Sequence, residues 1–497
     1  MEKPIINFWF LALIVFCFAI GCQPINQSDE SPPLNVLFIT IDDLRPQLGC
    51  YGDPIVQSPH IDHLASQGLL FNRAYCQQAL CAPSRSSFLT GRRPATTGVY
   101  DIETSVRDAL PDVVTLPQLF KNNGYESLGL FKVFHLVGFD PNGFGSLNDT
   151  VSWTRPLWLP TRSSYGPYGD SILRASKQAC LEQGPLGYGN IPRSLAYEAP
   201  TVADSMLNDG QVAQQAIRYL QSSQDEPFFL AVGFYHPHLP FTAPKKYWDQ
   251  YDRKQLRLPE NQYLPEGAPS YAVADNKELR SYIDIPDTAP FSDSLKQKLL
   301  HGYLAAISYV DAQVGLILKE LDRLNLRENT IVVLMGDHGY QIGEHGMWAK
   351  KHTNFEMATR VPLIISAPGQ TAQGQTTMAL TELVDIYPTL AELAGLTSDE
   401  LLEGSSLVPL LNDPDQDWKT AAFSSYPRGG RMGNSMRTDR YRLTAWTTEG
   451  KDTEYELYDH RHDPQENQNV VNQPDYLTVR DSLNQALEQG WSAATPR

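Results

Sequence analysis

The chain has no excess of basic residues. Its 497 residues include 40 lysines and arginines against 57 aspartates and glutamates, which gives a net charge of −17. Proteins that bind nucleic acid carry a basic surface, so this balance argues against a nucleic-acid partner. The charge is compatible with a small anionic ligand, because a local cationic pocket can lie within an acidic surface. Hydrophobic residues make up 41% of the chain, enough to bury the core of a large domain beside a smaller one.

The N-terminus lacks an apolar run long enough for a typical transmembrane helix. The run FWFLALIVFCFAI follows Lys3 and predicts an export signal over residues 1–21. Ala19-Ile20-Gly21-Cys22 resembles a bacterial lipobox, which predicts cleavage before Cys22 and a lipid on its sulfur. The alternatives are an ordinary secretory signal or a single membrane anchor. Residues 22–33 read as a polar linker. We therefore expect an exported lipoprotein, anchored by its lipid to a membrane in the periplasm or at the surface of a bacterium.

Cysteine is scarce, and no internal repeat is evident. The six cysteines are Cys17, Cys22, Cys50, Cys76, Cys81 and Cys180. Cys17 lies in the signal, Cys22 is the expected lipid site, and Cys81 begins a distinctive motif. The remaining three can form at most one disulfide among themselves, and the sequence does not indicate which pair.

Apolar strands alternate with helical patterns along residues 34–412. This alternation predicts an α/β fold with a mostly parallel sheet covered by helices on both faces. The region from about 150 to 200 is rich in Pro, Gly, Tyr and Trp, and predicts loops around a site. Residues 413–497 predict a smaller α+β subdomain. The expected strands are 35–41, 228–234 and 330–335, with weaker candidates at 125–131 and 361–366, and the expected helices include 58–68 and 303–324.

The stretch CAPSRSSFLTGRR, residues 81–93, predicts a helix that begins near Cys81. Pro83 suits the first turn because its missing N–H group is not needed there, and Gly91 is a typical helix end. Free N–H groups and the helix dipole favour negative charge at a helix N-terminus. Cys81 is therefore expected in a reactive centre that acts on an anion.

Polar side chains follow four of the predicted strands at the point where each strand ends. In parallel sheets, ligands bind beyond the carboxyl ends of the strands, so these side chains should meet at one edge. The carboxylates favour a hard divalent cation, calcium before magnesium. The lysine and histidines could bind a tetrahedral oxyanion and transfer protons. The residues are Asp42 and Asp43, Lys132 and His135, His236 and His238, and Asp337 and His338.

CAPSRSSFLTGRRP resembles the type I, formylglycine-dependent sulfatase signature, in which Cys-x-Pro-Ser-Arg precedes a Thr-Gly-Arg turn. The resemblance extends over nearly the whole chain after the signal. It includes the Asp-Asp pair, KVFH, HPHLPF, GDHGYQIGEHGMWAK and ELYDHRHDPQEN. The KVFH, HPHLPF and SSYPR stretches are most similar to the iduronate-2-sulfatase-like branch. The resemblance implies the alkaline-phosphatase-like sulfatase fold, with 34–412 as the catalytic domain.

The resemblance also implies a chemistry for Cys81. In this family a formylglycine-generating enzyme oxidises the cysteine to Cα-formylglycine, whose aldehyde is hydrated to a diol. One hydroxyl attacks sulfur and expels the alcohol, and the second then loses its proton so that sulfate leaves. A serine would stop at a sulfated enzyme, because it lacks the second hydroxyl.

Roles carry over to the matching positions. One calcium ion would be held by Asp42, Asp43, Asp337, His338 and the modified Cys81. Arg85 would hold the diol, and Lys132 and His135 would contact the sulfate and the diol. His238 would contact sulfate or act as the leaving-group acid, and His236 would bind substrate or serve a structural role. Arg428, in SSYPR, would line the sugar subsites.

Two lysines compete for a further contact with the sulfate. The stretch Trp348-Ala349-Lys350-Lys351-His352 has one residue more than the expected Trp-x-Lys-His pattern. Counting from Asp337 selects Lys350, which we prefer, and counting back from Asn354 selects Lys351.

The function implied is hydrolysis of a sulfate ester on a sulfated oligosaccharide, with a 2-O-sulfated uronic acid at a chain end as the expected substrate. The sequence alone leaves two alternatives open. One is a phosphonate or phosphodiester hydrolase of the same superfamily. The other is a non-catalytic surface protein that binds sulfated glycans, which applies if Cys81 stays unmodified.

Overall fold

The computed structural model describes residues 1, 32–136, 147–184, 186, 190–223, 226–398 and 401–496. The predicted export signal, the lipid site at Cys22 and most of the predicted linker lie outside these residues. No helix in the described part of the chain is long and apolar enough to cross a membrane. Residues Met1–Pro33 form one unit, and Leu34–Arg497 form a second, which holds the helices and strands of the described chain.

An eight-stranded mixed sheet forms the centre of this second unit. Its order is β10-β2-β11-β7-β1-β5-β3, and β12 pairs with β2. The neighbours β7, β1, β5 and β3 run parallel, so their carboxyl ends lie at one edge. β11 is antiparallel to both β7 and β2, which makes the sheet mixed. The strands are β1 Asn35–Ile41, β2 Leu69–Tyr75, β3 Glu126–Phe131, β5 Phe228–Phe234, β7 Thr330–Gly336, β10 Arg360–Val361, β11 Leu363–Ser366 and β12 Gln375–Glu382.

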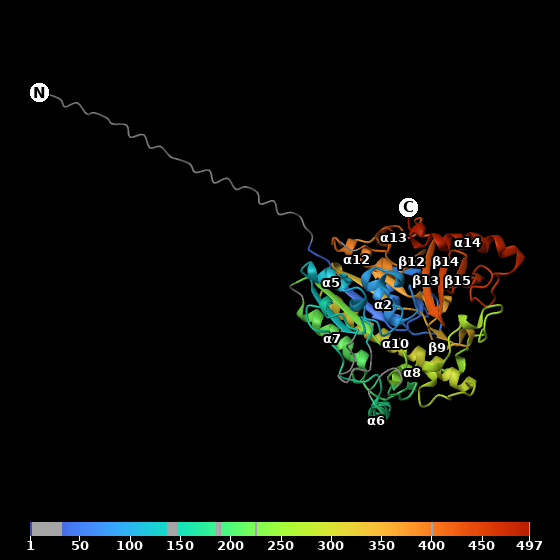
Figure 1. Ribbon diagram of the computed structural model, residues 1–497. Helices are drawn as coiled ribbons and strands as arrows, with labels where there is room; N and C mark the ends of the chain where they lie inside the picture. The colour runs from blue at the N-terminus through green and yellow to red at the C-terminus, as the bar shows by residue number, and fades with distance from the viewer. Residues whose placement is uncertain are drawn as a thin grey trace. The chain divides into compact units, whose positions relative to one another are not determined.

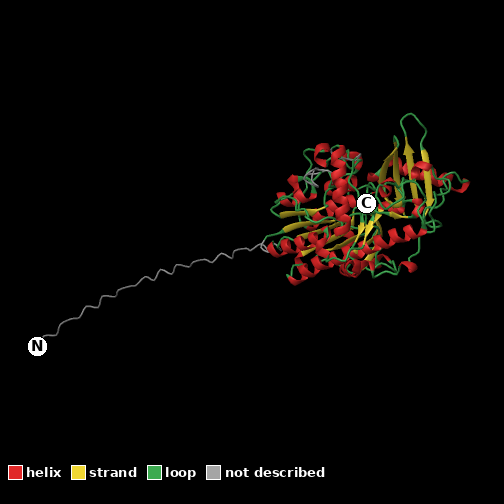
Figure 2. Cartoon of the chain, turned by 90° about the horizontal axis from the view of Figure 1, so that it is seen from below, coloured by secondary structure: helices red, strands yellow, loops and turns green. Residues whose placement is uncertain are grey.

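Helices cover both faces of the sheet, and β1 contributes alternate residues to the two cores (Figures 1 and 2). Leu37 and Ile39 pack in the core with α1, α7 and α10, whereas Val36 and Phe38 pack in the core with α2, α5 and α12. Successive strand residues point to opposite faces, so a strand buried on both sides has to be apolar throughout. The helices are α1 Pro59–Gln67, α7 Asn208–Ser222 and α10 Asp293–Arg323 on one face, and α2 Cys81–Thr90, α5 Leu116–Asn122 and α12 Ile386–Leu393 on the other.

The structure confirms the α/β prediction and the predicted strands. In the large sheet, the predicted strand 361–366 is divided into β10 and β11. Two strands of this sheet were not predicted: β2, whose polar Asn72 and Arg73 interrupt an apolar pattern, and the partly exposed β12. The region from 150 to 200 is less irregular than predicted, because it contains the helix α6, Pro167–Gln183. Cys50, Cys76, Cys81 and Cys180 are all free, so no disulfide links the cysteines of the described chain.

A second sheet of four antiparallel strands lies toward the C-terminus, beside α14 (Leu477–Gln489). Its strands are β13 Ala421–Arg428, β14 Arg431–Thr438, β15 Tyr441–Thr447 and β16 Glu454–Asp459. Buried charges join it to the large sheet: Lys419 Nζ lies 2.9 Å from Glu382 Oε2 and 2.5 Å from Asp385 Oδ1. The subdomain boundary predicted at 412/413 falls between α13 (Val408–Asn412) and β13, and it stays a prediction.

Asp311 of α10 holds the first turn of α1. Its Oδ1 accepts hydrogen bonds from the backbone N–H groups of His60 at 3.0 Å and Ile61 at 2.8 Å. Burial raises the pKa of Asp311 to about 7. Because the folded chain then binds this proton more tightly than the unfolded chain, the contribution of Asp311 to stability falls as pH rises from about 4 to about 7.

We predict that Asp311→Asn flattens this part of the pH dependence of stability. The amide oxygen can still accept both hydrogen bonds but does not ionise. Thermal or urea unfolding between pH 4 and 8 should show a slope shallower than that of the unmodified chain by at most about 1.4 kcal/mol per pH unit. Asp311→Ala should be less stable than Asp311→Asn at every pH, because it loses the acceptor as well. Equal slopes in the unmodified chain and Asp311→Asn would contradict the assignment.

Candidate active site

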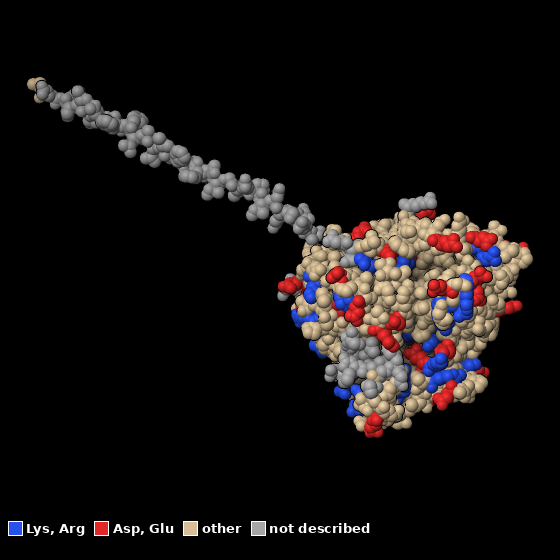
Figure 3. Space-filling model, viewed as in Figure 1, with Lys and Arg blue, Asp and Glu red and all other residues tan. Residues whose placement is uncertain are grey.

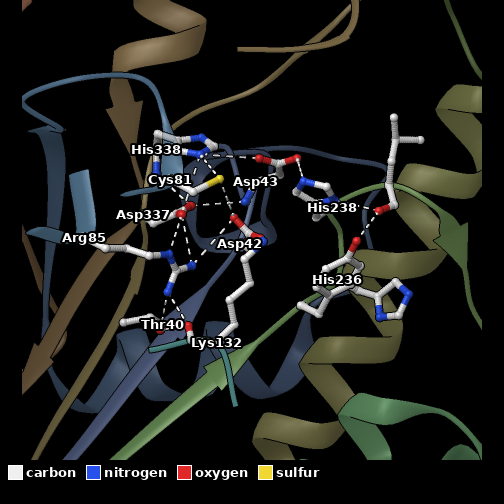
Figure 4. Close-up of polar contacts among 12 residues, drawn as sticks. Thr40, Asp42, Asp43, Cys81, Arg85, Lys132, His236, His238, Asp337 and His338 are labelled. Atoms are coloured by element: carbon white, nitrogen blue, oxygen red, sulfur yellow. Dashed lines mark hydrogen bonds and ion pairs between the residues drawn. The ribbon is translucent and has the colours of Figure 1, made fainter. Parts of the chain in front are cut away.

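The side chains predicted from four strand ends meet at one edge of the sheet. Asp42 and Asp43 follow β1, Lys132 follows β3, and Asp337 and His338 follow β7. Because β3, β5, β1 and β7 are parallel, each strand brings its next residues to the same edge. Figure 4 shows Asp42, Asp43, Asp337 and His338 around Cys81.

Cys81 is the first residue of α2 and is only 2% exposed. Its Sγ lies 3.4 Å from Asp42 Oδ1 and 3.2 Å from His338 Nε2. The prediction of a helix that begins near Cys81 and stops at Gly91 is confirmed: α2 spans Cys81–Thr90, and Gly91 is its C-cap. Burial and the nearby charge of Asp42 raise the pKa of the Cys81 thiol well above its usual value. An unmodified Cys81 would therefore be a protonated thiol, which is a weak nucleophile.

Arg85, one turn further along α2, joins the cysteine helix to two of the aspartates. Its Nε and Nη2 both lie 3.0 Å from Asp337 Oδ2, and Nη2 lies 3.6 Å from Asp42 Oδ1. Its Nη1 donates hydrogen bonds to the carbonyl oxygens of Lys132 and Val133. The guanidinium is thus fixed by groups that follow β1, β3 and β7.

The three aspartates are fully buried and are opposed by three buried cations. Lys132 Nζ contacts Asp42 Oδ2, Lys351 Nζ lies 2.7 Å from Asp43 Oδ1, and Arg85 binds Asp337. Burial raises the pKa of Asp337 to about 7 and, with the like charges of its neighbours, raises the pKa of Asp43 well above its usual value. For Asp42, burial alone would raise the pKa, but Lys132 and the other nearby cations outweigh it and lower the pKa.

The donor set fits a hard divalent cation. Asp42, Cys81, Asp337 and His338 place one potential ligand atom each within 4.8 Å of one another. Asp43 Oδ2 is buried and accepts no hydrogen bond from the described residues. His338 Nδ1 donates to the carbonyl of Gly339 at 2.9 Å, which leaves the lone pair of Nε2 facing the aspartates. A bound cation would accept the unsatisfied carboxylate oxygen and the oriented imidazole nitrogen as ligands.

The two histidines of HPHLPF take different positions. His238 Nδ1 donates to the carbonyl of Leu239 at 2.6 Å, and its Nε2 lies 3.9 Å from Asp43 Oδ2. Burial, with Lys351 and Lys132, lowers the pKa of His238 to about 3. His236 is fully buried, binds Asp209 through Nδ1 at 2.7 Å, and points away from Cys81 in Figure 4. These contacts favour the structural interpretation of His236 over a role in substrate binding.

Lys351, rather than Lys350, reaches the aspartates. Lys350 Nζ lies 3.9 Å from Glu278 Oε2 and has no ion pair with the three aspartates. Lys350 is the last residue of β9, Trp348–Lys350, whose pairing with β8, Gln341–Ile342, contains a register shift. The register shift lies in the same stretch that has one residue more than the expected pattern. The distances therefore favour Lys351 for the contact with the sulfate, against our preference from residue counting.

A cavity of about 720 Å³ lies beside the acidic centre, with Cys81 in its wall. Its wall includes Cys81, Lys132, His135, His238 and both lysines of the Trp348–His352 stretch, so six of the predicted residues face one space. The buried Nδ1 of His135 has no partner among the described residues. Burial and Lys132 lower the pKa of His135 well below the usual value. A second part of the wall comes from the 150–200 region, as predicted.

Arg428 lies outside the described wall of the cavity. Its Nη1 donates to the carbonyl of Val273 at 2.8 Å, and its Nη2 donates to the carbonyl of His352. It thus supports the backbone next to Lys351, and its role in substrate binding stays a prediction.

The helix α9, Lys277–Arg280, brings residues to the cavity that were not predicted from the sequence. Glu278 lies 3.8 Å from His238 Nε2 through its Oε1, and Tyr282 follows two residues after the helix. Lysines and His238 lower the pKa of Glu278 far below its usual value despite burial. The segment carries no strand pattern or motif, so no signal in the sequence pointed to it.

Comparison with protein families identifies the family of this chain. The family model described as sulfatase matches residues 34–396, and a model described as the C-terminal part of N-sulphoglucosamine sulphohydrolase matches residues 343–492. The chain belongs to the sulfatase family. It is therefore a sulfuric ester hydrolase, and the resemblance of its motifs to that family is confirmed.

Known relatives support the prediction that this sulfatase belongs to the iduronate-2-sulfatase-like branch. Human iduronate 2-sulfatase is 36% identical over an alignment that covers 88% of this chain and 89% of the relative. A sulfatase from Formosa agariphila is 31% identical over 91% of this chain and 86% of the relative.

Solved structures confirm the sulfatase fold. One that contains D-glucosamine-2-N,6-O-disulfate aligns with a TM-score of 0.71 at 21% identity, over 92% of this chain and 97% of the other. A phosphonate monoester hydrolase from Silicibacter pomeroyi aligns with a TM-score of 0.72 at 23% identity, over 93% and 96%. At these identities the likeness concerns the fold, which sulfate and phosphonate hydrolases share.

We predict that Lys351→Met lowers kcat/KM for sulfate ester hydrolysis by roughly 100-fold or more, because it removes a fixed cation from the acidic centre. Lys350→Met should cost less than about tenfold, since Lys350 Nζ lies near Glu278 and forms no ion pair with the three aspartates. Sulfate release measured for both variants decides the assignment. A larger loss for Lys350→Met would restore the assignment made by counting from Asp337.

Proposed function

We propose that this sulfatase removes sulfate from a 2-O-sulfated uronic acid at the end of a saccharide chain, with Cys81 converted to formylglycine. The observation that carries the proposal is the position of Cys81. It stands at the N-terminus of α2, beside Asp42 and His338, at the inner end of a cavity lined by lysines. The 36% identity to human iduronate 2-sulfatase supports the choice of substrate class.

The residues around Cys81 suit an anionic ester. The described wall of the cavity carries six lysines and arginines against two acidic residues, although the whole chain is acidic. Lys132 and Lys351 lie at the acidic centre, where they can bind sulfate oxygens and stabilise the charge that develops on them. Arg85 can hold an oxygen on the side chain of residue 81, because its guanidinium already lies between Asp42 and Asp337.

Formylglycine at position 81 would supply a hydrated aldehyde, with one hydroxyl to attack sulfur and a second to release sulfate. Calcium, held by Asp42, Asp43, Asp337, His338 and residue 81, would supply positive charge at the acidic centre. The buried Asp43 Oδ2 and the orientation of His338 fit such an ion. We also propose that a formylglycine-generating enzyme matures Cys81 and that Cys22 carries a lipid anchor. The protein would then be exported to the periplasm or cell surface.

His238 is suited to protonate the leaving oxygen. Its Nδ1 is occupied by the carbonyl of Leu239, so Nε2 is the nitrogen that faces the cavity. The pKa of about 3 reflects burial and two neighbouring lysines. A sulfate ester bound between these lysines adds negative charge, which raises the pKa of His238 and favours the protonated form that a general acid requires.

The experiment is sulfate release from a panel of sulfated oligosaccharides after co-expression with a formylglycine-generating enzyme. We expect release from a 2-O-sulfated uronate and none from the Cys81→Ala variant. Release only from other sugars would contradict the proposed 2-O-sulfated uronate substrate and would still support sulfate ester hydrolysis. Hydrolysis of phosphonate monoesters in place of sulfate esters would favour the alternative that the shared fold allows. Binding without turnover by the mature protein would indicate a non-catalytic glycan-binding protein.

We predict that the cost of His238→Ala depends on the leaving group. For a sugar sulfate, whose alcohol is a poor leaving group, kcat should fall by about 100- to 10,000-fold. For an aryl sulfate with an acidic phenol, the fall should be much smaller, because that oxygen leaves without a proton. His236→Gln, which keeps a hydrogen-bonding group beside Asp209, is the matched control and should show no such dependence. Equal losses of kcat on both esters would contradict the role of His238 as acid.

A further inference from the structure

The cavity has a second group of cations, which form no ion pair with the three aspartates. Arg162, Lys177 and Arg193 line the part of its wall that comes from the region from about 150 to 200. Arg162 and Lys177 are exposed, whereas Arg193 is half-buried. A cation that is partly shielded from water has a larger effect on binding than an exposed one, because water screens its charge less.

Arg193 is held in place without a carboxylate partner among the described residues. Its backbone N–H donates to Ser176 Oγ of α6 at 3.0 Å, and its guanidinium lies 5.2 Å from the centre of the Tyr282 ring. Its Nε is buried and has no hydrogen-bond partner in the described part of the chain.

Arginines that are more deeply buried in the described chain have such a partner. Arg85 pairs with Asp337 at 3.0 Å, Arg93 with Glu382 at 2.7 Å, and Arg442 with Glu466 at 2.6 Å. Withdrawing a charge even partly from water is costly when it has no carboxylate partner, and an arginine in this state inside a ligand cavity is suited to receive an anion from the ligand.

We propose that Arg193 binds the carboxylate of the uronic acid and thereby selects acidic over neutral sugars. This inference rests on the proposed function. The planar guanidinium can donate two parallel hydrogen bonds to a carboxylate, and contact with the flat Tyr282 ring fixes its plane.

Arg193 and His238 are connected along one wall of the cavity. Tyr282, under Arg193, follows α9, and Glu278 of α9 lies 3.8 Å from His238. A sugar whose sulfate lies at Lys132 and Lys351 can therefore extend along α9 toward Arg193. The cavity then binds two anions of one substrate, the sulfate at Lys132 and Lys351 and the carboxylate at Arg193.

The test compares two substrates in two proteins. The substrates are a disaccharide with a 2-O-sulfated uronate at its end and the same disaccharide with that carboxyl group reduced to an alcohol. We expect Arg193→Met to lower kcat/KM on the uronate by roughly 10- to 100-fold and to leave kcat/KM on the reduced sugar nearly unchanged. Arg193→Lys keeps the charge but loses the planar guanidinium with its two parallel donors. Its kcat/KM on the uronate should lie between the values for the unmodified enzyme and Arg193→Met. Arg218→Met, at an exposed arginine of α7, is the control.

Equal losses on both substrates, or no loss on either, would overturn the proposal, because neither outcome depends on the carboxylate. Calorimetric binding of the same sulfated uronate to Cys81→Ala, with and without Arg193→Met, gives a readout that does not require turnover. Weaker binding with Arg193→Met supports the proposal, and equal binding contradicts it. If the mature enzyme releases sulfate from neither sugar, the proposed function fails, and the binding comparison still decides the role of Arg193.

Discussion

Three carboxylates buried side by side are the constraint on which the site depends. Asp42, Asp43 and Asp337 have no exposed surface, and like charges so close repel one another strongly in a poorly solvated interior. Arg85, Lys132 and Lys351 offset this repulsion, and a divalent cation would offset more of it. Two of the cations that balance the aspartates, Lys132 and Lys351, also line the cavity and can bind a sulfate. Stability of the acidic cluster and recognition of the substrate thus use the same side chains.

The sheet supplies the rigidity that such a cluster needs. β3, β5, β1 and β7 lie side by side and parallel, so the residues after each strand are held close together by backbone pairing. The long helix α10 adds support, because Tyr303 donates a hydrogen bond to the carbonyl of Asp43 at 2.8 Å. Basic and acidic side chains are interspersed on the face of the molecule drawn in Figure 3, so the concentration of lysines and arginines in the cavity is a local feature.

Much of this was predictable from the sequence, for physical reasons. Strands buried on both faces are apolar throughout, and polar residues at their ends stand out against that pattern, as Asp42 and Asp337 do. Partly exposed strands such as β12 give a weaker pattern, and β2 is interrupted by two polar residues. The choice between Lys350 and Lys351 depended on a register shift in a short hairpin, which counting residues does not reveal. Glu278 and Arg193 reach the cavity from segments without a motif, so only the three-dimensional arrangement identifies them.

The central claim is that residue 81 acts as an aldehyde and not as a thiol. The most direct measurement is the mass of the peptide that contains this residue, taken from protein that releases sulfate. We expect a mass lowered by the difference between SH₂ and O, which is the change from the thiol to the free aldehyde, together with reaction of this peptide with a hydrazine. A fully active enzyme whose residue 81 is an unmodified cysteine would contradict the claim.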